Sequence, residues 1–318
     1  MALQLRNVHV GYYGAVMGLA GLGLTARSAA PLFPGVFRAP AYFTEPWIAA
    51  ALIALVALVF LYSAKLFLNP AAVKEDFTSP GLLGFCGAFP VGMTLVAGGL
   101  GPYAPGFADA LWWLGCAVLV VFQVWALSRL LAGSLEFTKF NAGWLIILVG
   151  GIVVPGPGIA LGEAEAARAF FGVSASVAPL LMALLLYRAA ALSPLPEGLR
   201  PTWFILLVPP SLIYANGSAL YNGFEPLENL FYFDVVLALA LFFYARRLVR
   251  WPFGPAWWAF TFPLDALAYA AVHFAQQHPS ALWRAVAGAA LLLATLFVSV
   301  VLLRSLAAIL RSASSPPA

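Results

Sequence analysis

Apolar residues occur along this chain in long runs of membrane length, separated by short stretches that hold most of the charged residues. A helix needs about 20 apolar residues to cross the hydrocarbon core of a bilayer. By that measure the pattern predicts an all-α polytopic membrane protein with about ten transmembrane helices. The expected helices cover residues 8–25, 46–67, 81–100, 108–131, 142–160, 170–187, 201–221, 227–245, 255–275 and 285–310.

Proline divides these segments into two alternating kinds. The third, fifth, seventh and ninth segments contain Pro90, Pro155, Pro209 and Pro263, which follow one another at intervals of 54 to 65 residues. We expect the even-numbered segments to be regular helices without an interior proline break. Broken helices are tolerated at membrane depth only beside protein or a water-filled cavity. The alternation therefore predicts five helical hairpins in a quasi-fivefold ring, with the broken helices inside, around a central pore.

The first segment fits this ring by position, but it carries glycine where the others carry proline, in GYYGAVMGLAGLG. Glycine loosens a helix more gently than proline does. Gly14 and Gly18 form a small-xxx-small pattern that predicts close packing against another helix. On an inner helix these glycines would also widen the pore. We therefore expect seven residues to line it: Gly14, Gly18, Pro90, Pro155, Pro209, Pro263 and Asp265.

The composition agrees with a membrane protein. The chain of 318 residues is 63% hydrophobic and only 9% charged, whereas soluble proteins carry roughly 25% charged residues. Because so few charged residues cannot cover a surface in water, we expect one transmembrane domain over residues 1–318.

The basic residues predict the orientation of this domain. Ten helices place twelve of the 16 Lys and Arg residues on one side of the membrane, and the other four are Arg27, Arg38, Arg168 and Arg284. The positive-inside rule then puts both termini in the cytoplasm. We expect a multi-pass protein of the bacterial inner membrane whose net charge of +4 orients it in the bilayer and does not bind nucleic acid.

The sequence offers no constellation for catalysis or metal binding. His9, His273 and His278 lack metal-ligand spacing, and Cys86 and Cys116 lie within apolar segments. A phosphate-binding P-loop and a Ser-His-Asp or H-E-x-x-H arrangement are also missing from the sequence. We therefore expect no enzyme, no metal and no cofactor.

Four stretches resemble the tellurite-resistance/dicarboxylate transporter family, which includes bacterial tellurite-resistance protein A and the plant slow anion channels. PTWFILLVPPSLIYANGSALY (201–221) and PAWWAFTFPLDALAYAAV (255–272) resemble its signature stretches. GYYGAVMGLAGL (11–22) and GWLIILVGGIVVPG (143–156) resemble its first and fifth helices. The resemblance implies the same ring of five hairpins, a homotrimer with one pore per subunit, and a phenylalanine, here Phe262, that plugs the pore. The chain departs from the family at Ala15-Val16-Met17, where proline is frequent, and at Asp265, where a small neutral residue is common.

Three residues at membrane depth are the main functional candidates. Phe262 directly precedes the Pro263 kink, so a change of its rotamer could open the pore. Asp265 is either a protonation site or a structural cap for N–H groups that Pro263 leaves unpaired. Asp234, in the eighth segment, is expected to pair with a neighbouring helix.

The sequence thus predicts channel-like transport of small anions through a pore gated by Phe262. Selectivity would come from the polarised backbone at the kinks and from hydroxyl groups such as those of Thr94, Ser211 and Thr261. The first alternative is a proton-coupled carrier for C4-dicarboxylates, tellurite or sulfite, in which Asp265 cycles its proton. The second is a non-transporting membrane scaffold or sensor, for which the short loops provide no docking domain.

Overall fold

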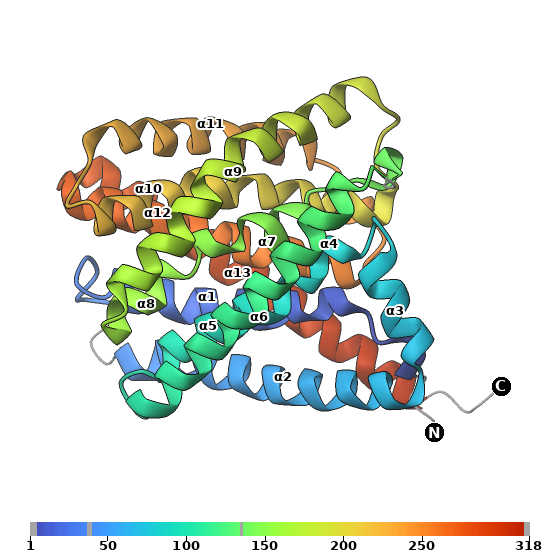
Figure 1. The fold of residues 1–318 in the computed structure, drawn as a ribbon. Coiled ribbons are helices and arrows are strands. Elements are labelled where there is room, and N and C mark those ends of the chain that lie inside the picture. The colour runs from blue at the N-terminus through green and yellow to red at the C-terminus, as the bar shows by residue number, and fades with distance from the viewer. Residues whose placement is uncertain (1–4, 37–39, 134–135, 315–318) are drawn as a thin grey trace.

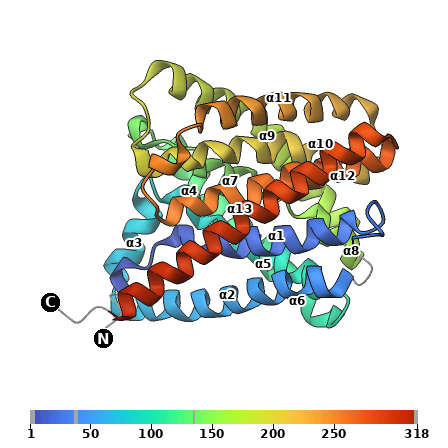
Figure 2. The same cartoon turned by 180° about the vertical axis from the view of Figure 1, so that it is seen from behind.

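The computed structural model describes residues 5–36, 40–133 and 136–314. Within these ranges every regular element is a helix, which confirms the predicted all-α fold. The long helices lie side by side in one bundle (Figures 1 and 2). Residue Leu5 and the C-terminal end of α13 (Ala281–Ser314) lie at the same end of this bundle, which we call the terminal end. The other is the distal end.

The even-numbered segments form continuous helices on the outside of the bundle. Only 17% to 28% of the residues in their most apolar stretches are buried, so their apolar side chains face outward. Such faces suit contact with lipid. These helices are α2 (Pro40–Leu68), α6 (Pro105–Leu131), α9 (Ala164–Ala191), α11 (Glu228–Tyr244) and α13.

The odd-numbered segments are buried, and each consists of two helical pieces in succession. In the third, fifth and seventh segments, 72% to 89% of the residues are buried. Burial therefore alternates along the chain as predicted. The first pieces are η2 (Val10–Tyr12), α4 (Leu83–Cys86), α7 (Gly143–Val149) with η4 (Gly150–Ile152), η5 (Glu197–Leu207) and η8 (Pro255–Phe260). The pieces that follow them are α1 (Tyr13–Ala29), α5 (Ala88–Leu100), α8 (Pro155–Leu161), α10 (Val208–Leu220) and α12 (Thr261–Gln277).

Eight helical stretches of the described residues are long and apolar enough to cross a membrane. They coincide with all the expected segments except the first and the ninth. Those two fold as α1 and α12, which have 17 residues each and pack against one another. At 1.5 Å per residue each is about 26 Å long, and η2 and η8 extend them toward the terminal end.

Each predicted proline kink is a junction between two helices, and the proline lies in the first turn of the second one. Pro155 is the first residue of α8, Pro209 the second of α10, and Pro90 and Pro263 the third of α5 and α12. N–H groups in a first turn have no partner within the helix, so a proline there removes no hydrogen bond. The chain therefore changes direction just before each proline.

The expectation that even-numbered segments contain no interior proline is wrong. Pro179 lies inside α9, and Pro46 lies inside α2 because that helix begins earlier than predicted. A proline can bend a helix without ending it, and both helices continue beyond theirs. Arg38, one of the four basic residues assigned to the second side, lies outside the described residues.

Short elements complete the connections. The sequence did not predict α3 (Pro70–Thr78), which follows α2 at the terminal end. The remaining elements are the 3₁₀ turns η1 (Leu5–Asn7), η3 (Phe137–Lys139), η6 (Glu225–Leu227) and η7 (Leu248–Arg250).

Candidate functional site

The inner segments enclose three cavities that follow one another from the terminal to the distal end. The terminal cavity, of about 260 Å³, is lined by His9 among others. The central cavity, of about 40 Å³, lies at the helix junctions beside Pro209. The distal cavity, of about 210 Å³, is lined by Thr25 and Asn216 among others. Every residue that lines the central or the distal cavity belongs to an odd-numbered segment.

Two side chains separate the central cavity from the distal one. Phe262 and Val153 line both cavities, so they form the wall between them. Phe262 is the second residue of α12 and is only 6% exposed. Its ring lies against Gly21 of α1, because a Cβ atom built on Gly21 would be 2.9 Å from its Cδ2 atom. The ring of Phe262 and the side chain of Val153 therefore lie between the two cavities.

The predicted lining residues fall into two groups. Gly14, Pro209 and Pro263 line the central cavity, and Asp265 lines the distal cavity. Gly18, Pro90 and Pro155 are not among the residues that line these cavities.

The glycines of α1 serve close packing against the ninth segment. A Cβ atom on Gly14 would be 3.1 Å from the Cβ atom of Trp258, and one on Gly18 would overlap the side chain of Thr261. Larger residues would push these two segments apart. The packing interpretation of this glycine pattern agrees with these contacts.

Asp265 is buried, at 1% exposure, and neither oxygen of its carboxyl group has a hydrogen-bond partner in the described part of the chain. The interpretation of this residue as a cap is therefore wrong, because the carboxyl group accepts no N–H group near Pro263. Only its main-chain oxygen is bonded, to the hydroxyl of Thr25 at 3.3 Å. An unpaired carboxyl group at this depth is a candidate for function.

Asn216 adds a second unpaired oxygen to the wall of the distal cavity. Its Nδ2 group donates to the main-chain oxygen of Ile152 at 2.7 Å, which fixes the orientation of the amide. Its Oδ1 atom has no partner among the residues that the structure describes. The distal cavity thus combines unpaired acceptor oxygens with the hydroxyl groups of Thr25 and Ser28.

The hydroxyl groups expected to provide selectivity are used elsewhere. Those of Thr94 and Thr261 donate to main-chain oxygens of their own segments. That of Ser211 on α10 donates to Asp234 on α11. This last bond confirms that Asp234 pairs with a neighbouring helix. None of the three hydroxyl residues lines the cavities described above.

Helix N-termini surround the central cavity. In every inner segment, residues near the junction line the central cavity and later residues line the distal one, as Pro209 and Asn216 do on α10. The second pieces of the five segments therefore run in the same direction, and their N-terminal ends meet at the centre. The first N–H groups of α1, α10 and α12 donate to main-chain oxygens of the preceding 3₁₀ pieces. Because these groups are already paired and the first-turn prolines have no N–H group, the junctions offer few free donors to an anion.

Arg27 lies near the distal cavity, but its charge is already paired. It forms an ion pair with Glu45 of α2 at 2.6 Å and donates to the main-chain oxygen of Gly99 at 2.9 Å. A second bond, of 3.5 Å, reaches the main-chain oxygen of Gly98, which lines the cavity. The guanidinium group therefore joins α1, α2 and α5 and does not extend into the cavity as a free cation.

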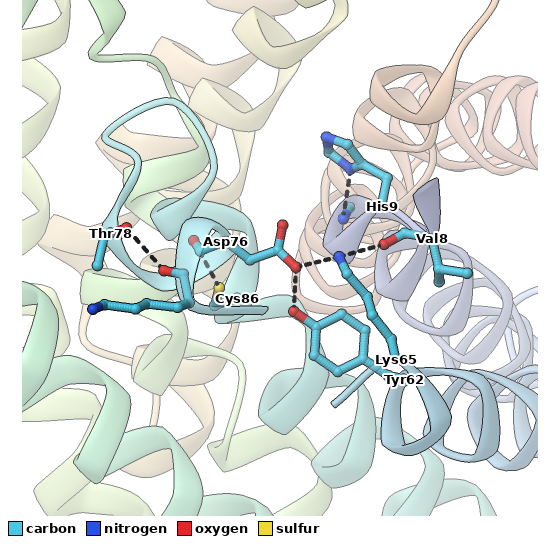
Figure 3. A network of polar contacts seen from close by, with 9 residues as sticks. Val8, His9, Tyr62, Lys65, Asp76, Thr78 and Cys86 are labelled. Atoms are coloured by element: carbon cyan, nitrogen blue, oxygen red, sulfur yellow. Dashed lines mark hydrogen bonds and ion pairs between the residues drawn. The ribbon is translucent and has the colours of Figure 1, made fainter. Parts of the chain in front are cut away.

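A buried ion pair anchors the N-terminal residues at the terminal end (Figure 3). Lys65 of α2 contacts Asp76 of α3 at 2.6 Å and donates to the main-chain oxygen of Val8 at 2.8 Å. Tyr62 donates to the same carboxylate oxygen of Asp76. Both charged side chains are almost fully buried, at 3% and 7% exposure.

His9 follows this anchor and lines the terminal cavity. Its Nδ1 atom accepts the N–H group of Gly11 at 2.9 Å, and its ring meets the edge of Phe85. An Nδ1 atom that accepts a hydrogen bond carries no proton, so this bond requires the neutral ring.

Comparison with known proteins gives consistent results. A family model described as SLAC1, voltage-dependent anion channel, matches residues 7–306. The S-type anion channel SLAH2 of Arabidopsis thaliana is 24% identical over 241 residues, which are 73% of this chain and 45% of that protein. The tellurite resistance protein TehA homolog of Haemophilus influenzae is 24% identical over 271 residues, 83% and 80% of the two chains. The guard cell S-type anion channel SLAC1 of Arabidopsis thaliana is 23% identical over 312 residues, 93% and 55% of the two chains. The chain thus spans about half the length of several relatives.

Proposed function

Because the chain belongs to the SLAC1 voltage-dependent anion channel family, we propose that it carries small anions across a membrane through its three aligned cavities. Phe262 is the plug that closes this path. In this proposal the protein binds no cofactor and catalyses no reaction.

The observation that carries the proposal is the position of Phe262 between the central and distal cavities. A ring at the narrowest point of an apolar passage excludes water, and an anion cannot cross where water is excluded. The match of residues 7–306 to the voltage-dependent anion channel family supports the choice of anions. The charge-free walls of the central cavity allow passage without tight binding.

The plug can be tested in liposomes that contain purified protein and a chloride gradient. We expect Phe262→Ala to raise chloride flux by at least about tenfold over the wild-type protein, because the missing ring joins the two cavities. Phe260→Ala is the matched control: that ring is also buried in the ninth segment, but it packs against Phe204 and lines neither cavity. Equal flux through wild-type and Phe262→Ala protein would contradict the proposal.

A proton-coupled carrier for C4-dicarboxylates, tellurite or sulfite is the second candidate, and the unpaired carboxyl group of Asp265 favours it. Such a carrier would accumulate its substrate against a gradient when a pH difference is applied. A channel would only equilibrate it. Uptake of malate with and without a pH gradient therefore distinguishes the two functions.

We also propose that the protein is a single-domain homotrimer of the bacterial inner membrane with both termini in the cytoplasm. The orientation is supported by the basic residues, which the sequence assigns mainly to the side of the termini. The exposed apolar faces of the outer helices would meet lipid or a second copy of the chain.

A further inference from the structure

The carboxyl group of Asp265 and the ring of Phe262 lie against the same point of α1. A Cβ atom on Gly21 would be 2.9 Å from Phe262 Cδ2 and 2.9 Å from Asp265 Oδ2. The two residues are three positions apart on α12, so their side chains lie on one face of that helix. The absent side chain of Gly21 leaves the space that both groups occupy. The ring and the carboxyl group are therefore neighbours at Gly21, and both residues line the distal cavity.

Among the residues that the structure describes, no charged group compensates Asp265. The ionisable residues on the neighbouring elements are engaged with other partners or lie at the ends of the bundle. Arg27 on α1 pairs with Glu45, Asp234 on α11 bonds Ser211, Tyr214 on α10 bonds Gln277, and Arg304 on α13 covers the rings of Phe253 and Trp257. On α12 itself, Tyr269 and His273 stack on one another, and His278 pairs with Glu228. On η5, Arg200 pairs with Glu197.

A carboxylate in such a place would be strongly destabilising. Both oxygens of Asp265 are inaccessible to water and have no donor within the described residues. A buried ion without a partner or water costs several kcal/mol, whereas the neutral acid does not carry this penalty. The closed arrangement thus fits the protonated acid. The open arrangement differs, because water from the distal cavity reaches the carboxyl group once the ring has moved.

We propose that the protonation state of Asp265 controls whether anions pass the open path. When Phe262 swings away from Gly21, the uncovered carboxyl group releases its proton to the water that enters and becomes a fixed negative charge. This charge opposes anions at the narrow point, so anions pass readily only while the carboxyl group is protonated. The inference rests on the proposed anion path and adds a control of selectivity by protons.

The test measures chloride flux through Phe262→Ala protein in liposomes at about pH 5 and about pH 8, where chloride itself carries no proton. We expect the flux to be at least about tenfold higher at the lower pH. At the higher pH the ionised carboxylate lies close to the passing anion and repels it strongly. In Phe262→Ala with Asp265→Asn, flux should be high and equal at both pH values, since the amide cannot ionise.

The matched control is Phe262→Ala with Asp234→Asn, which alters another buried carboxyl group that lines none of the three cavities. It should keep the full pH dependence. If the Asp265→Asn protein does not fold, Asp265→Ser provides a second neutral side chain of smaller size. The same pH ratio with and without Asp265 would overturn the inference while leaving the anion path intact. If Phe262→Ala protein passes no chloride at either pH, the proposed function fails, and this inference fails with it.

Discussion

At the residue scale, some buried polar side chains are paired across elements, and others keep an atom without a hydrogen-bond partner. Lys65 with Asp76 joins separate elements through complementary charges. Asp265 and Asn216 instead keep free oxygens, and both line the distal cavity. Because unpaired buried polar groups are destabilising, their location at one cavity is evidence for a role there.

The ion pair of Lys65 provides a prediction about stability. Lys65→Ala leaves the carboxylate of Asp76 buried without its cation and releases the main-chain oxygen of Val8. We expect a loss of about 3–5 kcal/mol, as for other broken buried ion pairs. The measurement is the free energy of unfolding of the purified protein in detergent micelles.

The control for this prediction is Lys139→Ala, which breaks an exposed pair with Glu136. Its effect should be below about 1 kcal/mol. Equal losses of unfolding free energy in both variants would show that the buried pair contributes no more to stability than the exposed pair.

The sequence identified Asp265 and Asp234 because an acid is conspicuous within an apolar run, and it identified Phe262 through the family resemblance of residues 255–272. It did not identify Gly21, nor the orientation of Asn216. Gly21 is important only because α1 packs against α12, and these helices lie at opposite ends of the chain. The interpretation of Asp265 as a cap for N–H groups was wrong for a related reason. The choice between a bonded and a free carboxyl group depends on tertiary packing, which residue spacing does not encode.

At the element scale, the inner segments are two-part helices, and in all but the first segment the second part has a proline in its first turn. The first part varies more: it is α-helical in the third segment and a 3₁₀ helix of 11 residues in the seventh. Such long 3₁₀ stretches are uncommon and often occur at hinges. The regular α-helices on the distal side thus begin at one level, around the central cavity.

The position of proline in these helices leads to a second prediction. Pro263→Ala should change the free energy of unfolding by less than about 1 kcal/mol, because a first-turn proline replaces no hydrogen bond. Ala268→Pro, further along the same helix, should cost about 3 kcal/mol or more. Thermal or denaturant unfolding of both variants checks this contrast. A large loss in Pro263→Ala would show that the proline itself maintains the junction.

The sequence predicted these elements because membrane length and proline spacing are local properties. It missed α3, since its nine residues include Lys74, Glu75 and Asp76 and form no apolar run. It also treated the even-numbered segments as free of interior proline, although α9 continues through Pro179. A proline therefore marks a junction only where neighbouring helices bury the interrupted backbone.

At the scale of the whole molecule, alternate burial of successive segments was predictable, and the shape of the path was not. The alternation follows from the cost of broken backbone in lipid. The volumes of the cavities depend on how five segments from distant parts of the chain meet. The orientation in the membrane, in turn, rests on the distribution of basic residues.

Orientation is open to a direct test with single introduced cysteines. Lys139→Cys lies at the terminal end, and Glu165→Cys lies near the start of α9 at the distal end. The native Cys86 and Cys116 are buried and should give little background. We expect a membrane-impermeant maleimide to label Glu165→Cys in intact cells and Lys139→Cys only after the membrane is permeabilised. The opposite pattern would place the termini outside.

The small size of the central cavity has a consequence for the proposed anion path. Its volume of about 40 Å³ holds about three water molecules. On that path an anion would leave most of its hydration shell behind, and the apolar walls would replace little of it. Dehydration would then be the main barrier, and we expect anions that hold water weakly to cross more easily than compact, strongly hydrated ones.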